Sequence, residues 1–264
     1  MNFYVRVFVE VHNDKKGVSN LSLNIGNVYQ STKCSSFFVL PHGQMGGSKG
    51  NVYQSRRLTP SVCPETGSNF KVGGPLWLGP LHDQDLVKTA LERLSDSSCN
   101  SPNMELIATR KRLQGLLTSV SEELDTPLYY TMPGLCQALR CSTPTNLQFK
   151  SAIINAGFKV SGYHKEPVAI KTDAPDHVVW DIMRAWIEKN PLQKAPEEGS
   201  PAAMILSKKR IIEVDFTMPE GGLGSSKEKV SRFPMNPESH WGPKKMATGK
   251  KKKDDDVVEA NKDQ

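Results

Sequence analysis

Basic side chains are the residues of this chain whose type and spacing could do chemistry. Three are consecutive, at Arg110, Lys111 and Arg112, and a second group follows later in the chain. The second group comprises Lys150, Lys159, His164, Lys165 and Lys171. Cationic side chains bind phosphate oxygens, and a formal net charge of +6 with a pI near 9.0 suits a polyanionic partner. The alternative is that they are ordinary solvated charges, which every soluble surface carries.

Other residue types argue against catalysis by this chain. No nucleophile or second acid lies near His164 in sequence, so we do not expect it to act as a general base. The segment 73–77 is glycine-rich, but Pro75 stiffens it, and Leu and Trp stand where a nucleotide cradle needs small residues. Tyr129 and Tyr163 could stack on bases, although core packing is the commoner role. We therefore assign no catalytic and no cofactor-binding residues.

The cysteines indicate a reducing compartment. Five are scattered along the chain, without the spacing of a disulfide framework. They are Cys34, Cys63, Cys99, Cys136 and Cys141. Free thiols of this kind are typical of the nucleus or the cytoplasm. No run approaches the roughly 20 apolar residues that a membrane span requires, so we expect no membrane partner.

The elements that must position these residues begin with β structure. Alternating apolar residues predict a strand over residues 1–11, and we interpret a chain that opens in a strand as a fragment or a truncated gene product. Short β-like runs follow at 27–30 and 37–40. The hexapeptide Gly-Asn-Val-Tyr-Gln-Ser occurs twice, at 26–31 and 50–55, which suggests a duplicated hairpin or a local duplication of the coding sequence.

A loop and a series of helices are expected next. Residues 73–83 read as a Gly/Pro-punctuated loop anchored by buried Trp77 and Leu78. Apolar residues at helical spacing, with capping residues before them, predict helices after that loop. Those helices cover 83–94, 104–124, 131–139, 144–156 and 175–189, capped among others by Asp83, Thr131, Thr143 and Asp173. Two strands, 158–163 and 168–172, form a ribbon. Helix, helix, helix and ribbon is the order of a winged-helix module.

Composition changes near the C-terminus. Residues 193–232 are expected to be largely flexible, with β-prone pieces at 203–206 and 211–216. The basic run around Lys250–Lys253 could be a nuclear-import signal, a tail that binds RNA, or an unused solvated segment.

The predicted fold class is α+β, with four parts. Residues 1–82 form a strand and an irregular β-rich segment, and 83–192 form the helical, winged-helix-like domain. Residues 193–243 are extended or flexible, and 244–264 are a disordered charged tail.

Several segments, taken in order, carry a resemblance. The first are Phe3-Tyr-Val-Arg-Val-Phe-Val9, Gly73-Gly-Pro-Leu-Trp-Leu-Gly-Pro-Leu-His-Asp83 and Pro127-Leu-Tyr-Tyr130. Later ones are residues 151–161, Ala169-Ile-Lys-Thr-Asp-Ala-Pro175, Trp180-Asp-Ile-Met-Arg184 and residues 232–244. Together they resemble the C-terminal half of the tRNA guanine-26 N2-dimethyltransferase family.

The resemblance implies an enzyme that uses S-adenosylmethionine to place two methyl groups on one tRNA guanine. In that family the methyltransferase domain precedes the strand at 3–9, and its cofactor and target-amine motifs do not occur here. We therefore expect a tRNA-binding part that has no turnover of its own, with catalysis supplied by a separate domain or chain. The basic residues above would contact tRNA phosphates. An alternative is a protein-interaction module derived from such a domain.

The resemblance also raises the question of zinc. The family often carries two Cys-x-x-Cys pairs before the Gly-Gly-Pro segment, but this chain reads Ser31-Thr-Lys-Cys34 and Cys63-Pro-Glu-Thr66. Because a structural zinc needs four ligands, Cys34 and Cys63 are an incomplete set, and His42 or His82 do not complete it at a zinc spacing. We expect no bound zinc, and a degenerate zinc ribbon is a further alternative for this region.

Overall fold

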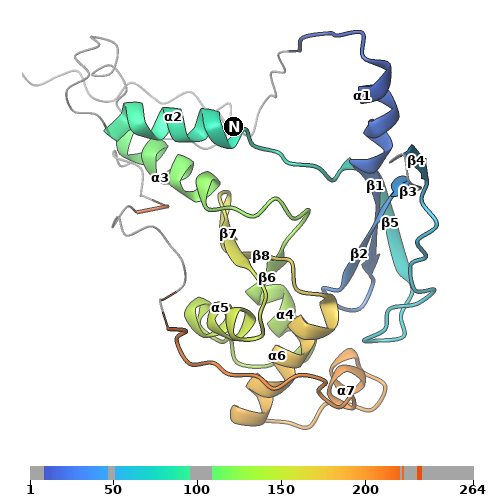
Figure 1. Ribbon diagram of the computed structural model, residues 1–264. Coiled ribbons are helices and arrows are strands. Elements are labelled where there is room, and N and C mark those ends of the chain that lie inside the picture. Colours follow the sequence, from blue (N-terminus) through green and yellow to red (C-terminus); the bar gives the residue numbers. More distant parts are fainter. Residues whose placement is uncertain (1–8, 47–50, 96–108, 221, 223–230, 234–264) are drawn as a thin grey trace, which may run out of the picture.

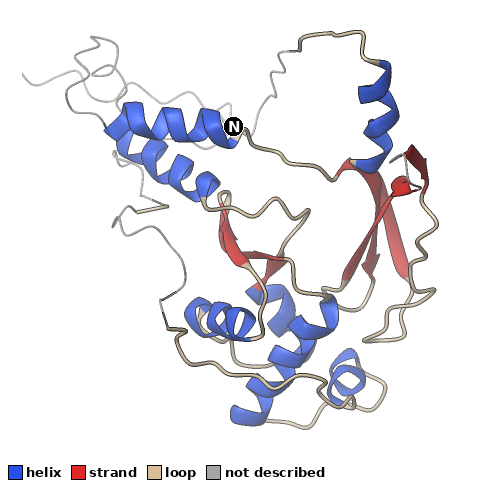
Figure 2. Ribbon diagram, viewed as in Figure 1, coloured by secondary structure: helices blue, strands red, loops and turns tan. Residues whose placement is uncertain are grey.

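The computed structural model describes residues 9–46, 51–95, 109–220, 222 and 231–233 (Figure 1). A β-rich part precedes a helical part, and both contain small sheets (Figure 2). The fold is therefore α+β. The predicted strand at 1–11 lies mostly outside the described residues, and residues 9–14 are not in a strand. The predicted disordered tail, 244–264, lies outside the described residues as well.

The β-rich part begins with helix α1 (Lys15–Asn20), which Asp14 caps, and the 3-10 helix η1 (Leu21–Leu23). Its main sheet has the order β2-β1-β5, formed by β1 (Ile25–Ser31), β2 (Phe37–Pro41) and β5 (Phe70–Trp77), all antiparallel. A separate hairpin joins β3 (Gly43–Gly46) to β4 (Asn51–Gln54). The runs at 27–30 and 37–40 are confirmed as strands.

Strand β5 corrects the expectation of a loop over residues 73–83. The register shifts between Gly26 and Val28 of β1, opposite Gly74 and Pro75, so the ladder tolerates a proline that has no N–H to donate. Trp77 was expected to be buried, but it is 42% exposed at the end of this edge strand, where its Nε1 donates to the carbonyl of Pro80 at 3.0 Å. Leu78 is partly buried.

The repeated hexapeptide is not a duplicated hairpin. Its first copy lies in β1, at the centre of the three-stranded sheet, whereas residues 51–54 of the second copy form β4 of the separate two-stranded sheet. The same amino-acid sequence therefore forms a central strand in one place and an edge strand in the other. The difference arises because β1 pairs with β2 and β5, whereas β4 pairs with β3.

The helical part contains α2 (Gln84–Ser95), α3 (Arg110–Ser121), α4 (Met132–Leu139), α5 (Asn146–Asn155), α6 (Asp176–Lys189) and α7 (Pro201–Leu206). Strands β6 (Tyr130–Thr131), β7 (Val160–Tyr163) and β8 (Glu166–Thr172) form a third antiparallel sheet, of order β6-β8-β7. The ribbon and the five expected helices are confirmed, except that residues 104–108 lie outside the described residues. The α2–α3 hairpin lies apart from the other helices in Figure 1.

Capping explains where these helices begin. Thr131 accepts a hydrogen bond from Gly134 N at the start of α4, as expected, and Asp83 accepts from Leu86 N at the start of α2. Thr145, rather than Thr143, caps α5 in a reciprocal capping box with Gln148. Asp173 does not cap α6; its carboxylate accepts from Lys159 N at 2.8 Å and so closes the base of the ribbon.

The core is built around α6. Its middle is buried on all sides: Val179, Trp180, Ile182 and Met183 are fully inaccessible and belong to one hydrophobic cluster with residues of α4, α5 and β8. Phe37 of β2 stacks against Tyr130 of β6 at 4.8 Å between ring centroids, which joins the β-rich part to this core. On α5, Ile153 is fully buried in this core, whereas Leu147 is 46% exposed.

The segment after α6 is a further correction. Residues 201–206 form helix α7 and not a β-prone piece, because Ser200 caps the helix and Pro201 occupies its first turn. Ile205 is fully buried, and Ile212, Val214 and Phe216 pack against the same core without forming a strand. In Figure 1 the orange segment after α7 crosses α6 and then passes below α5.

Candidate functional site

A buried carboxylate lies at the centre of the candidate site. Glu123, two residues beyond α3, has a side chain with no exposed surface. Its Oε1 accepts from Lys171 Nζ at 2.9 Å, and its Oε2 accepts from the backbone N of His164 at 3.0 Å and lies 2.8 Å from His164 Nδ1. Burial alone would raise the pKa of Glu123, but the hydrogen bonds from Lys171 and His164 outweigh it and lower the pKa. The carboxylate is therefore ionised at neutral pH.

A second imidazole faces the same carboxylate. His82 lies in the segment between β5 and α2, and its Nε2 is 3.8 Å from Glu123 Oε1, beyond hydrogen-bond distance. This nitrogen is buried and has no hydrogen-bond partner among the described residues. The His82 and His164 rings meet edge to face, with centroids 5.3 Å apart. Three elements far apart in sequence thus converge on Glu123.

Local structure explains the convergence. His164 occupies the turn between β7 and β8, and Lys171 lies near the end of β8 with its side chain inward. The Ser161 hydroxyl on β7 accepts from Leu124 N at 3.0 Å, which holds the end of α3 against the ribbon. Glu123 lies three and four residues after buried Val120 and Ser119, so it continues the buried face of α3.

An aromatic cavity of about 200 Å³ adjoins this cluster. Trp77, His82, Tyr129, Tyr163 and Lys171 are among its lining residues. The Tyr129 and Tyr163 rings stack on each other, with centroids 4.7 Å apart. The site thus combines a buried ion pair, two imidazoles and exposed aromatic surface.

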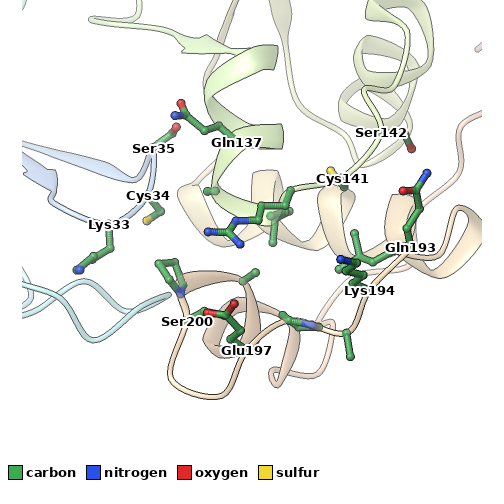
Figure 3. A pocket seen from close by; sticks show the side chains of 18 of the residues that line it. Lys33, Cys34, Ser35, Gln137, Cys141, Ser142, Gln193, Lys194, Glu197 and Ser200 are labelled. Carbon is green, nitrogen blue, oxygen red and sulfur yellow. The ribbon is translucent and has the colours of Figure 1, made fainter.

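A larger hollow of about 880 Å³ lies between the Cys34 loop, the end of α4 and residues 191–202. In Figure 3, Cys34 stands on one side of it and Cys141 on the other. Its charged lining residues are all exposed: Lys33, Arg140, Lys194 and Glu197. Functional sites are enriched in charged groups that are buried beside a specific partner. Glu123 is such a group and the charges around this hollow are solvated, so we regard the Glu123 cluster as the stronger candidate.

The basic residues expected to bind phosphate are not all on the surface. Lys111, Arg112, Lys159 and Lys165 are exposed. Arg110 is half-buried, and its Nε donates to the carbonyl of Leu94 at 2.9 Å, which ties α3 to α2.

Three further basic residues turn inward. Lys150 was expected to be exposed but is half-buried, and burial together with the nearby Arg232 lowers its pKa. Lys171 is 5% exposed and is bound to Glu123, and His164 is partly buried on the same carboxylate. Lys171 and His164 therefore face a carboxylate instead of solvent.

The two half-pairs of cysteine do meet. Cys34 Sγ and Cys63 Sγ are 3.6 Å apart, and the hydroxyls of Ser31 and Ser36 are each 3.2 Å from Cys34 Sγ. The hydrogen bond from Cys34 lowers the pKa of Cys63 to about 4 and raises that of Cys34. In the described part of the chain no third histidine, cysteine or carboxylate joins them, and hydroxyls are not the usual zinc ligands. The residues present do not fit a structural zinc.

Sequence reasoning missed Glu123, although its helical spacing from Val120 was a usable signal. It considered His82 only as a zinc ligand beside the cysteines. Within the described residues, no helix is long and apolar enough to cross a bilayer.

The fold and site define an α+β protein whose helical part combines a buried charge cluster with exposed basic residues. A family model described as N2,N2-dimethylguanosine tRNA methyltransferase matches residues 1–184. The chain belongs to this family, as the resemblance in sequence had indicated.

Curated relatives support the assignment. The chain is 39% identical over 252 residues to tRNA (guanine(26)-N(2))-dimethyltransferase 2 of Arabidopsis thaliana, covering 94% of this chain and 42% of the relative. It is 37% identical over 265 residues to the Homo sapiens tRNA (guanine(26)-N(2))-dimethyltransferase, covering 98% and 39%. The chain therefore spans less than half the length of these relatives.

Among solved structures, Trm1 from Pyrococcus horikoshii with S-adenosyl-L-methionine aligns with a TM-score of 0.44 and 26% identity. The alignment covers 62% of this chain and 36% of that one. This score is too low to establish a shared fold.

Proposed function

We propose that this chain is the tRNA-docking part of an S-adenosylmethionine-dependent tRNA (guanine-26 N2)-dimethyltransferase. The observation that carries the proposal is the family match, which extends over most of the chain. The chain covers only 42% of its Arabidopsis relative, so cofactor binding and methyl transfer are proposed to belong to a domain or chain not represented here. Action in the nucleus or the cytoplasm remains a prediction.

We propose further that residues 110–172 are a winged-helix module. The support is the element order α3, β6, α4, α5, β7, β8, together with the sheet order β6-β8-β7. In this arrangement the β7–β8 ribbon is the wing, and Lys159 and Lys165 lie at its base and its tip. Both are exposed, and cations at such positions neutralise phosphates of a nucleic-acid backbone.

The inward-facing residues refine the proposed contact surface. Lys171 and His164 would support the wing from inside through Glu123, while Lys111, Arg112, Lys159 and Lys165 would contact tRNA. On α5, Asn155 donates to the carbonyls of Asp215 and Thr217 at 3.0 and 2.9 Å, so the end of that helix is covered by the C-terminal segment. The proposed docking therefore uses the wing and α3 more than α5.

The test is tRNA binding by purified residues 1–264, titrated across salt concentration. Cofactor binding and methyl transfer are measured in parallel. We expect binding that weakens steeply with salt, and no methyl transfer by this chain alone. Removing two phosphate contacts in Lys159→Ala/Lys165→Ala should lower the slope of log affinity against log salt by about 0.7–0.9 per contact. The matched control is Lys15→Ala/Lys16→Ala, which removes the same charge from exposed α1.

A protein-interaction module is the second candidate. It is favoured by exposed apolar side chains along β5, in the linker after it and at the start of α2: Val72 at 61%, Trp77 at 42%, Leu81 at 66% and Leu86 at 67%. Absence of tRNA binding at low salt, or binding that does not respond to salt, would contradict RNA docking and support this candidate. Methyl transfer by the isolated chain would contradict the proposed division of labour.

A further inference from the structure

Three potential metal ligands meet at Glu123. The ligand atoms of His82, Glu123 and His164 all lie within 4.8 Å of one another. We propose that these three side chains form a zinc-binding site, distinct from the Cys34–Cys63 pair. Two neutral imidazoles and one carboxylate are a recognised ligand set for zinc, and three protein ligands leave the fourth position open.

The spacing suits the proposal. Bonds of about 2.0–2.2 Å in a tetrahedral site place neighbouring ligand atoms about 3.4 Å apart. His164 Nδ1 is 2.8 Å from Glu123 Oε2, and His82 Nε2 is 3.8 Å from the other carboxylate oxygen, Oε1. Each imidazole thus lies within about 0.6 Å of that separation from one oxygen of the carboxylate.

The unpaired nitrogen of His82 points independently to a ligand. A buried polar atom without a partner costs free energy, and nearly all such atoms in folded proteins are satisfied. His82 Nε2 is buried, unpaired among the described residues and directed at the carboxylate. A metal ion between His82 and Glu123 would satisfy it.

Lys171 sets the affinity. Its ammonium lies 2.9 Å from Glu123 Oε1 and neutralises the carboxylate in the absence of a metal. A zinc ion must therefore bind close to the Lys171 ammonium, and the repulsion between the two cations weakens zinc binding. His82 and Lys171 also line the aromatic cavity beside the cluster, so water or a substrate oxygen could complete the site from that side. Replacing Lys171 by methionine should strengthen metal binding, whereas a phosphate-binding role for Lys171 predicts no such gain.

The experiment uses the full chain without a histidine tag, dialysed against zinc and analysed for metal content, with affinity measured by competition with a chromogenic chelator. We expect one zinc per chain. His82→Gln should weaken binding by at least about 100-fold, because even the outer partners of metal ligands change affinity by about 10- to 100-fold. This variant breaks no hydrogen bond of the described structure, so circular dichroism should show an unchanged fold. His164→Gln should weaken binding to a similar degree.

The matched control is Cys34→Ser/Cys63→Ser, which removes both nearby thiols and should leave the zinc content unchanged. Cobalt substitution provides a second readout, since a sulfur-to-metal charge-transfer band is expected only when thiolates bind. Failure to retain zinc, loss of zinc in the cysteine variant, or an unchanged affinity in His82→Gln would each overturn the site.

Discussion

At the scale of single residues, Asp176 makes the stability of the fold depend on pH. It begins α6, directly after the Ala169–Pro175 segment, and its Oδ1 accepts from the Tyr130 hydroxyl at 3.1 Å. Burial raises its pKa to about 6 against an ordinary value of 3.8, and the negative charges of Glu65 and Cys63 act in the same direction. The native state therefore holds this proton more tightly than the unfolded chain does.

The sign of the pH effect follows from that shift. The contribution of Asp176 is fully present below pH 3.8 and is lost as the pH rises through about 6. Asp176→Asn keeps the acceptor for Tyr130 but cannot ionise, so it should raise the free energy of unfolding at pH 7.5 by up to about 3 kcal/mol. Urea unfolding of both proteins from pH 4 to 8 measures the difference. If the variant is less stable than the native chain across this range, ionisation of Asp176 does not lower the free energy of unfolding as we infer.

Residue types correctly predicted which lysines of the ribbon's ends are exposed, but not which lysines are buried. Lys159 and Lys165 are exposed, as a charged turn and ribbon end should be, but Lys171 and Lys150 turn inward. In a strand, alternate side chains face opposite sides, and the sequence alone does not say which side a neighbouring carboxylate will occupy. Lysine is rarely buried unless it is paired, and the pairing of Lys171 with Glu123 could not be read from residue types.

At the scale of elements, α6 acts as a clamp. Arg184 binds Asp181 of the same helix at 2.6 Å, Glu65 of the β-rich part and, through Nε, the carbonyl of Ile205 in α7 at 2.9 Å. Asp181 also accepts from the backbone N–H groups of Ile211 and Ile212 at 2.8 and 3.2 Å. The segment Trp180-Asp-Ile-Met-Arg184, which carried part of the family resemblance, is therefore structural.

Breaking this clamp should be costly. Arg184→Met keeps most of the side-chain volume but removes the guanidinium from the buried carboxylates of Asp181 and Glu65. Loss of one partner of a buried ion pair typically costs about 3–5 kcal/mol. Lys208, 3.7 Å from Glu65, and the backbone donors to Asp181 remain, so we expect the lower end of this range. The midpoint of urea unfolding should fall accordingly. Lys88→Ala, which removes only an exposed ion pair with Asp85, should change stability by less than about 0.5 kcal/mol. Equal effects of the two substitutions would show that the buried network contributes little.

Helices and the ribbon were predictable because their signals are local. Apolar spacing, Thr131 and the capping box at Thr145 act within one turn of the chain. Strand β5 was not predictable in the same way, because Gly and Pro residues are typical of loops. They fit a strand here because β1 pairs with β5 through a ladder whose register shifts opposite them. Helix α7 was read as β-prone since its apolar residues were weighed without the Ser200 cap.

At the scale of the whole molecule, the segment after α6 holds the domain together. Ala202 is 5% exposed and Ile205 is 0% exposed, and Ile212, Val214 and Phe216 cover the core below α6. Residues 193–232 were expected to be flexible, yet much of this segment supplies core contacts. Its hydrogen bonds to Asp181 and Arg184 connect it to the clamp.

Truncation tests this role. A chain that ends at Asn190 should lose several kcal/mol, because each large apolar side chain contributes about 1.5–3 kcal/mol on burial. Since a domain is stable by only about 5–15 kcal/mol, we expect a partly unfolded protein that is degraded rapidly in limited proteolysis. A chain that ends at Phe233 keeps the segment and should resist protease like the full chain. Equal resistance of the two truncated chains would show that the segment is dispensable.

The sequence by itself determined the family, the α+β class, the helices from α2 to α6, the caps at Asp83 and Thr131, and the exposure of Lys159 and Lys165. These features depend on short stretches of chain. Only the tertiary structure decided that His82, Glu123, His164 and Lys171 form one cluster, and that Arg184 joins Glu65 to α7. These residues come from the linker before α2, the end of α3, two turns, strand β8 and helices α6 and α7. Contacts between such distant residues follow from how elements pack, and neither the period of apolar residues nor local capping encodes that packing.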